Sequence, residues 1–75
     1  MIEIVVLAGT YGQARSWANK KGYHPSVVRI VRGPDSYYGL FQVPFVKVGE
    51  WWKNRDLAEF ERYAESHEIV ELETE

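Results

Sequence analysis

Apolar residues along the chain fall into short continuous runs separated by polar stretches that contain glycine. The first run, Ile2 to Ala8, is interrupted only by Glu3. A run of this length is typical of a strand that is buried on both faces of a parallel sheet. Helical spacing of apolar residues predicts one helix over about 13–22 and another over about 55–66. Shorter apolar runs predict three further strands, at 27–31, 44–48 and 69–72.

Capping signals mark the start of both predicted helices. Thr10 and Gln13 fit a capping box, in which each side chain bonds a backbone N–H group at the first turn. Asn54 or Asp56 can cap the second helix. Asp56 and Glu59 resemble a second capping box, so both helices are expected to begin after a short polar loop.

The strand–helix–strand order occurs twice and predicts an α/β fold of two βαβ-type units. Right-handed crossovers place the second strand beside the first. The simplest continuation places the third strand on the other side of the first, with the fourth strand beyond it. This gives a four-stranded, mainly parallel sheet of order 2-1-3-4 with one helix on each face. We expect a single domain over residues 1–72 and a frayed acidic tail over 73–75.

Composition and charge narrow the class of protein. The 75 residues include no cysteine, which excludes disulfides and fits a reducing compartment. No apolar run approaches the length that spans a membrane, so we expect a cytoplasmic protein. Residues 1–32 carry five basic groups and one acidic group, whereas residues 33–75 carry four basic and ten acidic groups. The basic part is too sparse to predict nucleic-acid binding.

The predicted topology places one candidate ligand site. In open α/β sheets, ligands bind beyond the carboxyl ends of the strands, where the winding of the chain reverses. Here that crevice falls between the first and third strands, with Gly9–Gly12 and Gly49–Trp52 as its walls. A glycine loop that enters a helix is a candidate anion site. The alternative is that these glycines only serve a turn that needs positive φ. The candidate ligand-binding residues are Gly9, Thr10, Tyr11, Gly12, Gln13, Arg15, Arg32 and Arg55.

Aromatic residues suggest a second kind of site. Two adjacent pairs stand out, Tyr37-Tyr38 and Trp51-Trp52. Because neighbouring side chains point in different directions, we expect one member of each pair in the core and the other at the surface, available to a partner. His24 and His67 are isolated from other metal ligands, and no nucleophile motif is present. The sequence therefore predicts no catalytic residue, metal site or cofactor.

The whole chain is similar to one known group of proteins, and the similarity is seen in three stretches: VVLAGTYGQARSWA, VRIVRGPDSYYGL and VKVGEWWKNRDLAEF. They resemble small proteins encoded by bacteriophages of actinobacteria. The resemblance implies a compact α/β accessory protein with a host protein as its target, in the host cytoplasm. It supplies no catalytic residues.

A second resemblance is local and concerns the glutaredoxins. Gly9–Gly12 stands where glutaredoxins carry CPYC, Val43–Val46 is similar to their VP element with its cis proline, and Asp56-Leu57 is similar to their DL helix start. Both cysteines are absent here, which excludes thiol redox chemistry. Only eleven residues separate the second strand from Val43, too few for the intervening helix of that fold. A degenerate thioredoxin-like fold, with the fourth strand antiparallel to the third, is the alternative architecture.

These observations lead to a non-enzymatic binding protein. The first hypothesis is a protein-interaction module that uses Tyr37, Tyr38, Trp51 and Trp52. The alternative is a binder of a nucleotide or another small anion at the strand-end crevice. A redox-inactive thioredoxin-like protein is a third hypothesis. We also consider a homodimer, because two helices leave part of a four-stranded sheet uncovered.

Overall fold

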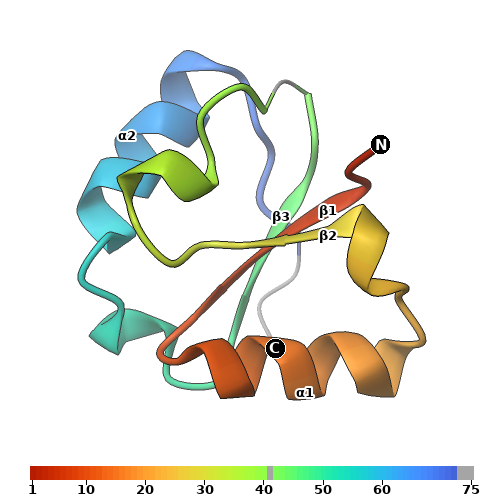
Figure 1. Ribbon diagram of the computed structural model, residues 1–75. Helices are drawn as coiled ribbons and strands as arrows, with labels where there is room; N and C mark the ends of the chain where they lie inside the picture. The colour runs from red at the N-terminus through yellow and green to blue at the C-terminus, as the bar shows by residue number, and fades with distance from the viewer. Residues whose placement is uncertain (41, 73–75) are drawn as a thin grey trace.

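A parallel sheet lies at the centre of the molecule, with helices on both sides (Figure 1). The computed structural model describes residues 1–40 and 42–72. Its strands are β1 (Ile4–Ala8), β2 (Val28–Ile30) and β3 (Phe45–Val48), and its helices are α1 (Tyr11–Lys21) and α2 (Leu57–Ser66). Three short 3-10 turns complete it: η1 (Pro25–Val27), η2 (Pro34–Ser36) and η3 (Trp51–Lys53).

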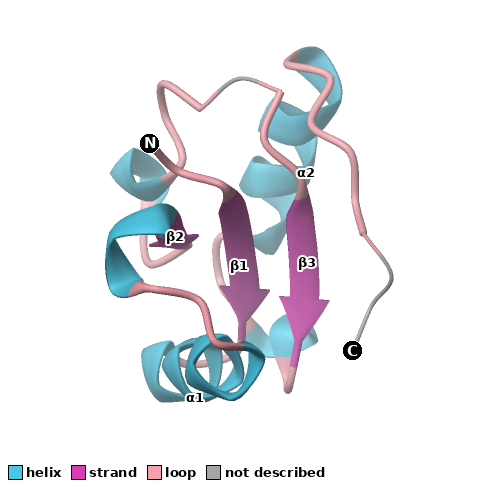
Figure 2. Ribbon diagram, turned by 90° about the vertical axis from the view of Figure 1, so that its right-hand side faces the viewer, coloured by secondary structure: helices cyan, strands magenta, loops and turns pink. Residues whose placement is uncertain are grey.

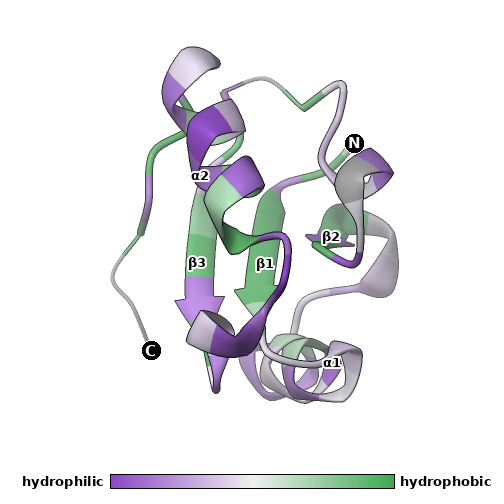
Figure 3. Cartoon of the chain, turned by 90° about the vertical axis from the view of Figure 1, so that its left-hand side faces the viewer, coloured by the Kyte–Doolittle hydropathy of each residue, from purple (hydrophilic) through white to green (hydrophobic). Residues whose placement is uncertain are grey.

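The strand β1 is the central strand, as its apolar sequence predicts. All five of its residues are buried, and it pairs in parallel with β2 on one side and β3 on the other. Alternate residues point to opposite faces, so Val6 packs with the α1 side and Val5 with the α2 side. Figure 2 shows α1 and α2 on opposite faces of the sheet, and Figure 3 shows the hydrophobic colouring along β1. The expected helix on each face is therefore present.

The prediction of a four-stranded sheet is wrong. Within the described residues the sheet has three strands, in the order β2-β1-β3. The segment expected as a fourth strand contributes a single bridge, between Phe45 and Glu71. Two hydrogen bonds hold it, from Phe45 N to Val70 O at 3.1 Å and from Leu72 N to Phe45 O at 2.7 Å. The bridge is parallel, whereas the thioredoxin-like alternative required an antiparallel strand.

The way α2 ends explains why this strand does not form. Glu68 adopts a left-handed conformation, with φ of 55°. The N–H group of Ile69 bonds the carbonyl of Ala64 at 2.8 Å, which closes the helix end in the manner of a Schellman motif. Ile69 then packs into the core. Ile69, one of the three apolar residues that suggested a strand, therefore terminates the helix instead. The expected tail at 73–75 lies outside the described residues.

Aromatic rings fill the space between the sheet and α2. Tyr37 is fully buried and contacts Tyr38, Phe60 and Tyr63, with ring centroids 5.1 to 5.2 Å apart. Lys47 joins the same layer from β3 through an ion pair with Glu61 of α2 at 2.9 Å. That contact raises the pKa of Lys47. These contacts fix α2 against the sheet.

The hydroxyl of Tyr37 is buried without a hydrogen-bond partner among the described residues. Burial, together with the nearby Glu59 carboxylate, raises the pKa of Tyr37 to about 12 from its ordinary value of 10.0. A buried donor that lacks an acceptor destabilises a fold by about 1–3 kcal/mol. The ring of Tyr37 therefore stabilises the core by packing, whereas its unpaired hydroxyl destabilises the fold.

We expect Tyr37→Phe to raise the free energy of unfolding by about 1 kcal/mol at pH 7, because it removes that hydroxyl. The raised pKa adds a pH effect. Between pH 10 and 12 the unfolded chain loses the Tyr37 proton before the folded chain does, so stability falls as the pH rises through this window. Urea denaturation at several pH values should show a weaker alkaline loss in Tyr37→Phe.

The matched control is Tyr23→Phe, because Tyr23 stacks on Trp17 on the other side of the sheet. At pH 7 this variant should not be more stable than the wild type, because the Tyr23 hydroxyl is not a buried group without a partner. A Tyr37→Phe variant that is less stable than the wild type at pH 7 would contradict the unpaired hydroxyl.

Candidate functional site

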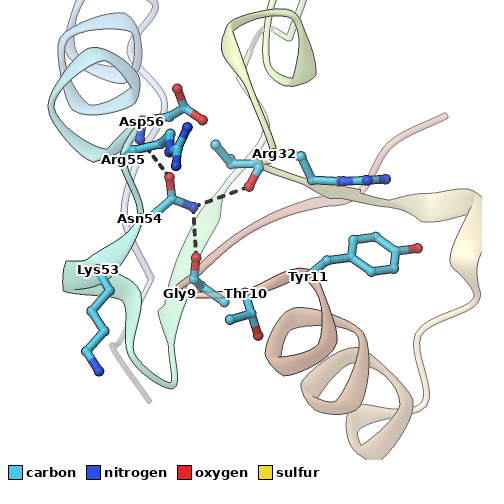
Figure 4. Close-up of a pocket in the computed structure, with 10 residues that line it drawn as sticks. Gly9, Thr10, Tyr11, Arg32, Lys53, Asn54, Arg55 and Asp56 are labelled. Carbon is cyan, nitrogen blue, oxygen red and sulfur yellow. Dashed lines mark hydrogen bonds between the residues drawn. The ribbon is translucent and has the colours of Figure 1, made fainter.

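A hollow of about 360 Å³ lies beyond the carboxyl ends of β1 and β2 (Figure 4). Its floor comes from Ala8, the last residue of β1, and from Val31, which follows β2. The loop into α1 forms one wall and the segment between η3 and α2 forms another. The remaining lining residues are Gly9, Thr10, Tyr11, Arg32, Lys53, Asn54, Arg55 and Asp56.

Three cations line this strand-end pocket. Arg32 lies over the ring of Tyr11, with its guanidinium carbon 4.6 Å from the ring centroid. Figure 4 shows the Arg32 side chain extending over Tyr11, with Lys53 and Arg55 on the opposite side of the pocket. Among the described residues, neither Arg32 nor Arg55 forms an ion pair with a carboxylate. Lys53, in contrast, pairs with Glu50 at 2.6 Å.

The side chain of Asn54 connects the floor of the pocket to its wall. Its amide nitrogen donates to the carbonyl of Ala8 at 2.8 Å and to that of Val31 at 3.3 Å. Its amide oxygen accepts the backbone N–H of Asp56 at 2.8 Å. One side chain therefore joins the ends of two parallel strands to the start of α2. Sequence reasoning proposed Asn54 only as a helix cap and missed its two strand contacts.

The pocket is displaced from the crevice that the topology predicted. The expected crevice between β1 and β3 is closed by protein atoms. Gln13 donates from its amide to the Glu50 carboxylate at 3.0 Å and accepts the Glu50 N–H at 3.0 Å. Gly9 lies directly against the backbone of Glu50. The strand-end pocket consequently lies on the β2 side of β1, and a separate groove lies between α1 and the end of β3.

The same contacts correct the interpretation of the loop glycines. Positive φ among the described glycines occurs at Gly22, Gly39 and Gly49, so neither Gly9 nor Gly12 needs it. A Cβ atom on Gly9 would clash with the Glu50 carbonyl oxygen and lie 3.0 Å from Glu50 Cβ. Gly9 is therefore required by a close approach between two loops.

Each predicted capping box is only partly right. Thr10 does cap α1, because its hydroxyl accepts the Gln13 N–H at 3.1 Å. The Gln13 side chain does not return to Thr10, since Glu50 binds it. Asp56 occupies the N-cap position of α2 but makes no side-chain cap bond. Hydrogen bonds from Lys53 and Gln13 lower the pKa of Glu50, which fits an ionised acceptor between two donors.

The candidate ligand-binding residues separate into two groups. Gly9, Thr10, Tyr11, Arg32 and Arg55 come together around the strand-end pocket. The others lie elsewhere. Gly12 and Gln13 line a separate groove of about 410 Å³ along α1, and Arg15 rests against the Tyr11 ring at 5.6 Å. Lys53, Asn54 and Asp56 were missed, although a polar run before a helix is itself a capping signal.

The candidate interaction residues do not form one surface. Tyr37 is buried in the core, and Trp51 is half-buried with Lys47 over its ring at 4.6 Å. Tyr38 is 49% exposed and donates to Glu59, and Trp52 is 58% exposed. Tyr37 is thus in the core and Tyr38 is at the surface, whereas Trp51 is only half-buried beside the exposed Trp52.

Within residues 1–40 and 42–72, no cluster of His, Cys, Asp or Glu could hold a metal ion, and no helix is long and apolar enough to cross a membrane. The chain matches no family model, no curated protein and no solved structure. The phage and glutaredoxin resemblances therefore remain expectations from the sequence, and any function has to be argued from the pocket.

The contact between Gly9 and Glu50 gives a first prediction for this region. We expect Gly9→Ala to lower the free energy of unfolding by about 1–3 kcal/mol, because the new methyl group must push the two loops apart. Gly12→Ala is the matched variant. Its Cβ would lie 3.9 Å from Thr10 Oγ1, so Gly12→Ala should be neutral or stabilise α1 by up to about 1 kcal/mol. Urea denaturation measures both, and equal losses would contradict the close approach.

The Asn54 contacts give a second prediction. We expect Asn54→Ala to lower the free energy of unfolding by about 2–3 kcal/mol, because two strand carbonyls lose a donor and the backbone N–H of Asp56, at the start of α2, loses its acceptor. Asp56→Ala should change stability by less than about 0.5 kcal/mol, since the Asp56 side chain caps nothing. Thermal or urea unfolding of the two variants tests the difference. A larger loss of stability in Asp56→Ala than in Asn54→Ala would contradict this prediction, because it would show that the Asp56 side chain stabilises the start of α2.

Proposed function

We propose that this protein binds a small anionic ligand in the strand-end pocket and does not catalyse a reaction. The observation that carries the proposal is the pair of guanidinium groups, Arg32 and Arg55, which line one hollow without a carboxylate partner among the described residues. Guanidinium groups bind carboxylates and phosphates through paired, charge-assisted hydrogen bonds. Two of them left unpaired at one pocket favour an anion as its occupant.

Two further features support this proposal. The volume, about 360 Å³, falls in the range of sites for small molecules. The first turn of α1 begins at Tyr11 on the pocket wall, and a helix leaves the N–H groups of its first turn without intrahelical acceptors. Tyr11, the first residue of α1, therefore lines the same pocket as the two arginines. Because the chain has no cysteine, we also propose that it acts in the cytoplasm.

Titration of ¹⁵N-labelled protein with inorganic phosphate tests the site. The backbone amide signals of Gly9 and Tyr11 should shift together and saturate. We expect Arg32→Ala and Arg55→Ala each to weaken phosphate binding by about tenfold, the usual contribution of one charged hydrogen-bonding group. Arg15→Ala should change the affinity by less than about twofold, because Arg15 contacts Tyr11 and does not line the pocket.

The matched control is Arg62→Ala. Arg62 is exposed on α2 and is not among the residues that line the pocket. This variant has the same loss of charge as the others and should bind phosphate as the wild type does. If all four arginine variants weaken binding equally, the effect is one of net charge and the pocket is not the site.

A protein-interaction module is the second candidate, and one observation favours it. Trp52 is 58% exposed on η3, and exposed tryptophan is enriched at protein interfaces. We rank it second because Tyr37 is buried and Trp51 is half-buried, so the four aromatic residues do not form one exposed surface. A host protein or a second copy of the chain would in this case contact Trp52 and the adjacent η3 turn.

A further inference from the structure

Asp56 supplies the one carboxylate among the residues that line the pocket. Its side chain forms no hydrogen bond or ion pair among the described residues. It is half-buried and lines the hollow with Arg32 and Arg55. It stands at the N-cap of α2, where an aspartate usually accepts a helix N–H, yet it makes no cap bond. Its own backbone N–H is used by Asn54. Two carboxylate oxygens are thus left as acceptors inside a cationic pocket.

This arrangement bears on the nature of the ligand. A simple anion would be repelled by Asp56, so the carboxylate weakens the binding of inorganic phosphate. A ligand that also carries a neutral donor would gain a charge-assisted hydrogen bond there. An ammonium donor is disfavoured, because three cations line the same hollow. A hydroxyl group carries no charge and can donate to Asp56 without this repulsion.

We infer that the ligand is a hydroxyl-bearing phosphomonoester of the sugar-phosphate or nucleoside-monophosphate class. Arg32 and Arg55 bind its phosphate, and Asp56 accepts hydrogen bonds from its hydroxyl groups. This inference rests on the proposed function, because it assigns the second half of the same site. The volume of about 360 Å³ leaves room for more than a phosphate group alone.

The test compares two phosphomonoesters, ribose 5-phosphate and methyl phosphate, by isothermal titration calorimetry or by the amide shifts of Gly9 and Tyr11. Both carry the same charged group, and only the first carries hydroxyl donors beyond it. For the wild-type protein, ribose 5-phosphate should bind about tenfold more tightly than methyl phosphate, the usual gain from a hydrogen bond to a charged group.

Asp56→Ala should then move the two affinities in opposite directions. Methyl phosphate should bind more tightly, by roughly two- to fivefold, because a negative charge has been removed. Ribose 5-phosphate should lose its advantage, and the ratio of the two affinities should fall towards one. Glu65→Ala is the matched control: Glu65 is exposed on α2 and does not line the pocket, so both affinities should stay as in the wild type.

The outcomes separate the two proposals. If methyl phosphate and ribose 5-phosphate both fail to bind the wild type, the proposed anion site is wrong. If both bind equally well, or if Asp56→Ala strengthens both to the same extent, the anion site stands and the role of Asp56 is wrong. The same conclusion follows if the ratio of affinities is unchanged in Asp56→Ala.

Discussion

The side-chain amide of Asn54 is the contact on which the arrangement of the molecule depends. Parallel strands end in carbonyl groups that no further ladder satisfies, and a helix begins with N–H groups that lack acceptors. Asn54 meets both needs at once, since it donates to Ala8 and Val31 and accepts from Asp56. A carboxylate or a hydroxyl at this position could not serve all three groups. The short amide side chain therefore joins the sheet to α2 at one point.

The same contact explains where the pocket lies. Because Asn54 is bonded to two strand ends, the residues on either side of it, Lys53 and Arg55, are held beside the carboxyl edge of the sheet. Gln13 and Glu50 meanwhile fill the gap on the β3 side. The hydrogen bonds of Asn54, Gln13 and Glu50 thus stabilise the fold and also determine the shape of the pocket. A ligand that binds these walls would also stabilise the fold by mass action.

The sequence was informative where a local pattern decides the structure. The apolar run of β1 and the helical spacing of α1 and α2 were sufficient to predict the elements and their α/β order. Ile69 shows the limit of this reasoning, because an apolar residue that ends a helix looks like one that begins a strand. The pairing of Gln13 with Glu50 joins residues 37 positions apart, and no local signal reports it. The strand-end pocket therefore lies at the predicted edge of the sheet but beside β2, while the groove beside β3 is lined by Gly12, Gln13 and Gly49.

The two outer strands, β2 and β3, share a feature that affects whether the sheet can pair with the sheet of another molecule. Each carries a cation at an interior position, and each cation has a partner within the protein: Arg29 of β2 donates to the Ser36 carbonyl at 2.9 Å, and Lys47 of β3 pairs with Glu61. The edge of β3 is further occupied at Phe45 by the parallel bridge, and β2 is only three residues long. Short strands with internally directed charges are poor templates for pairing with a neighbouring sheet. Growth of the sheet from one molecule to the next is disfavoured on both sides, which leaves loops and helix faces as the surfaces for recognition.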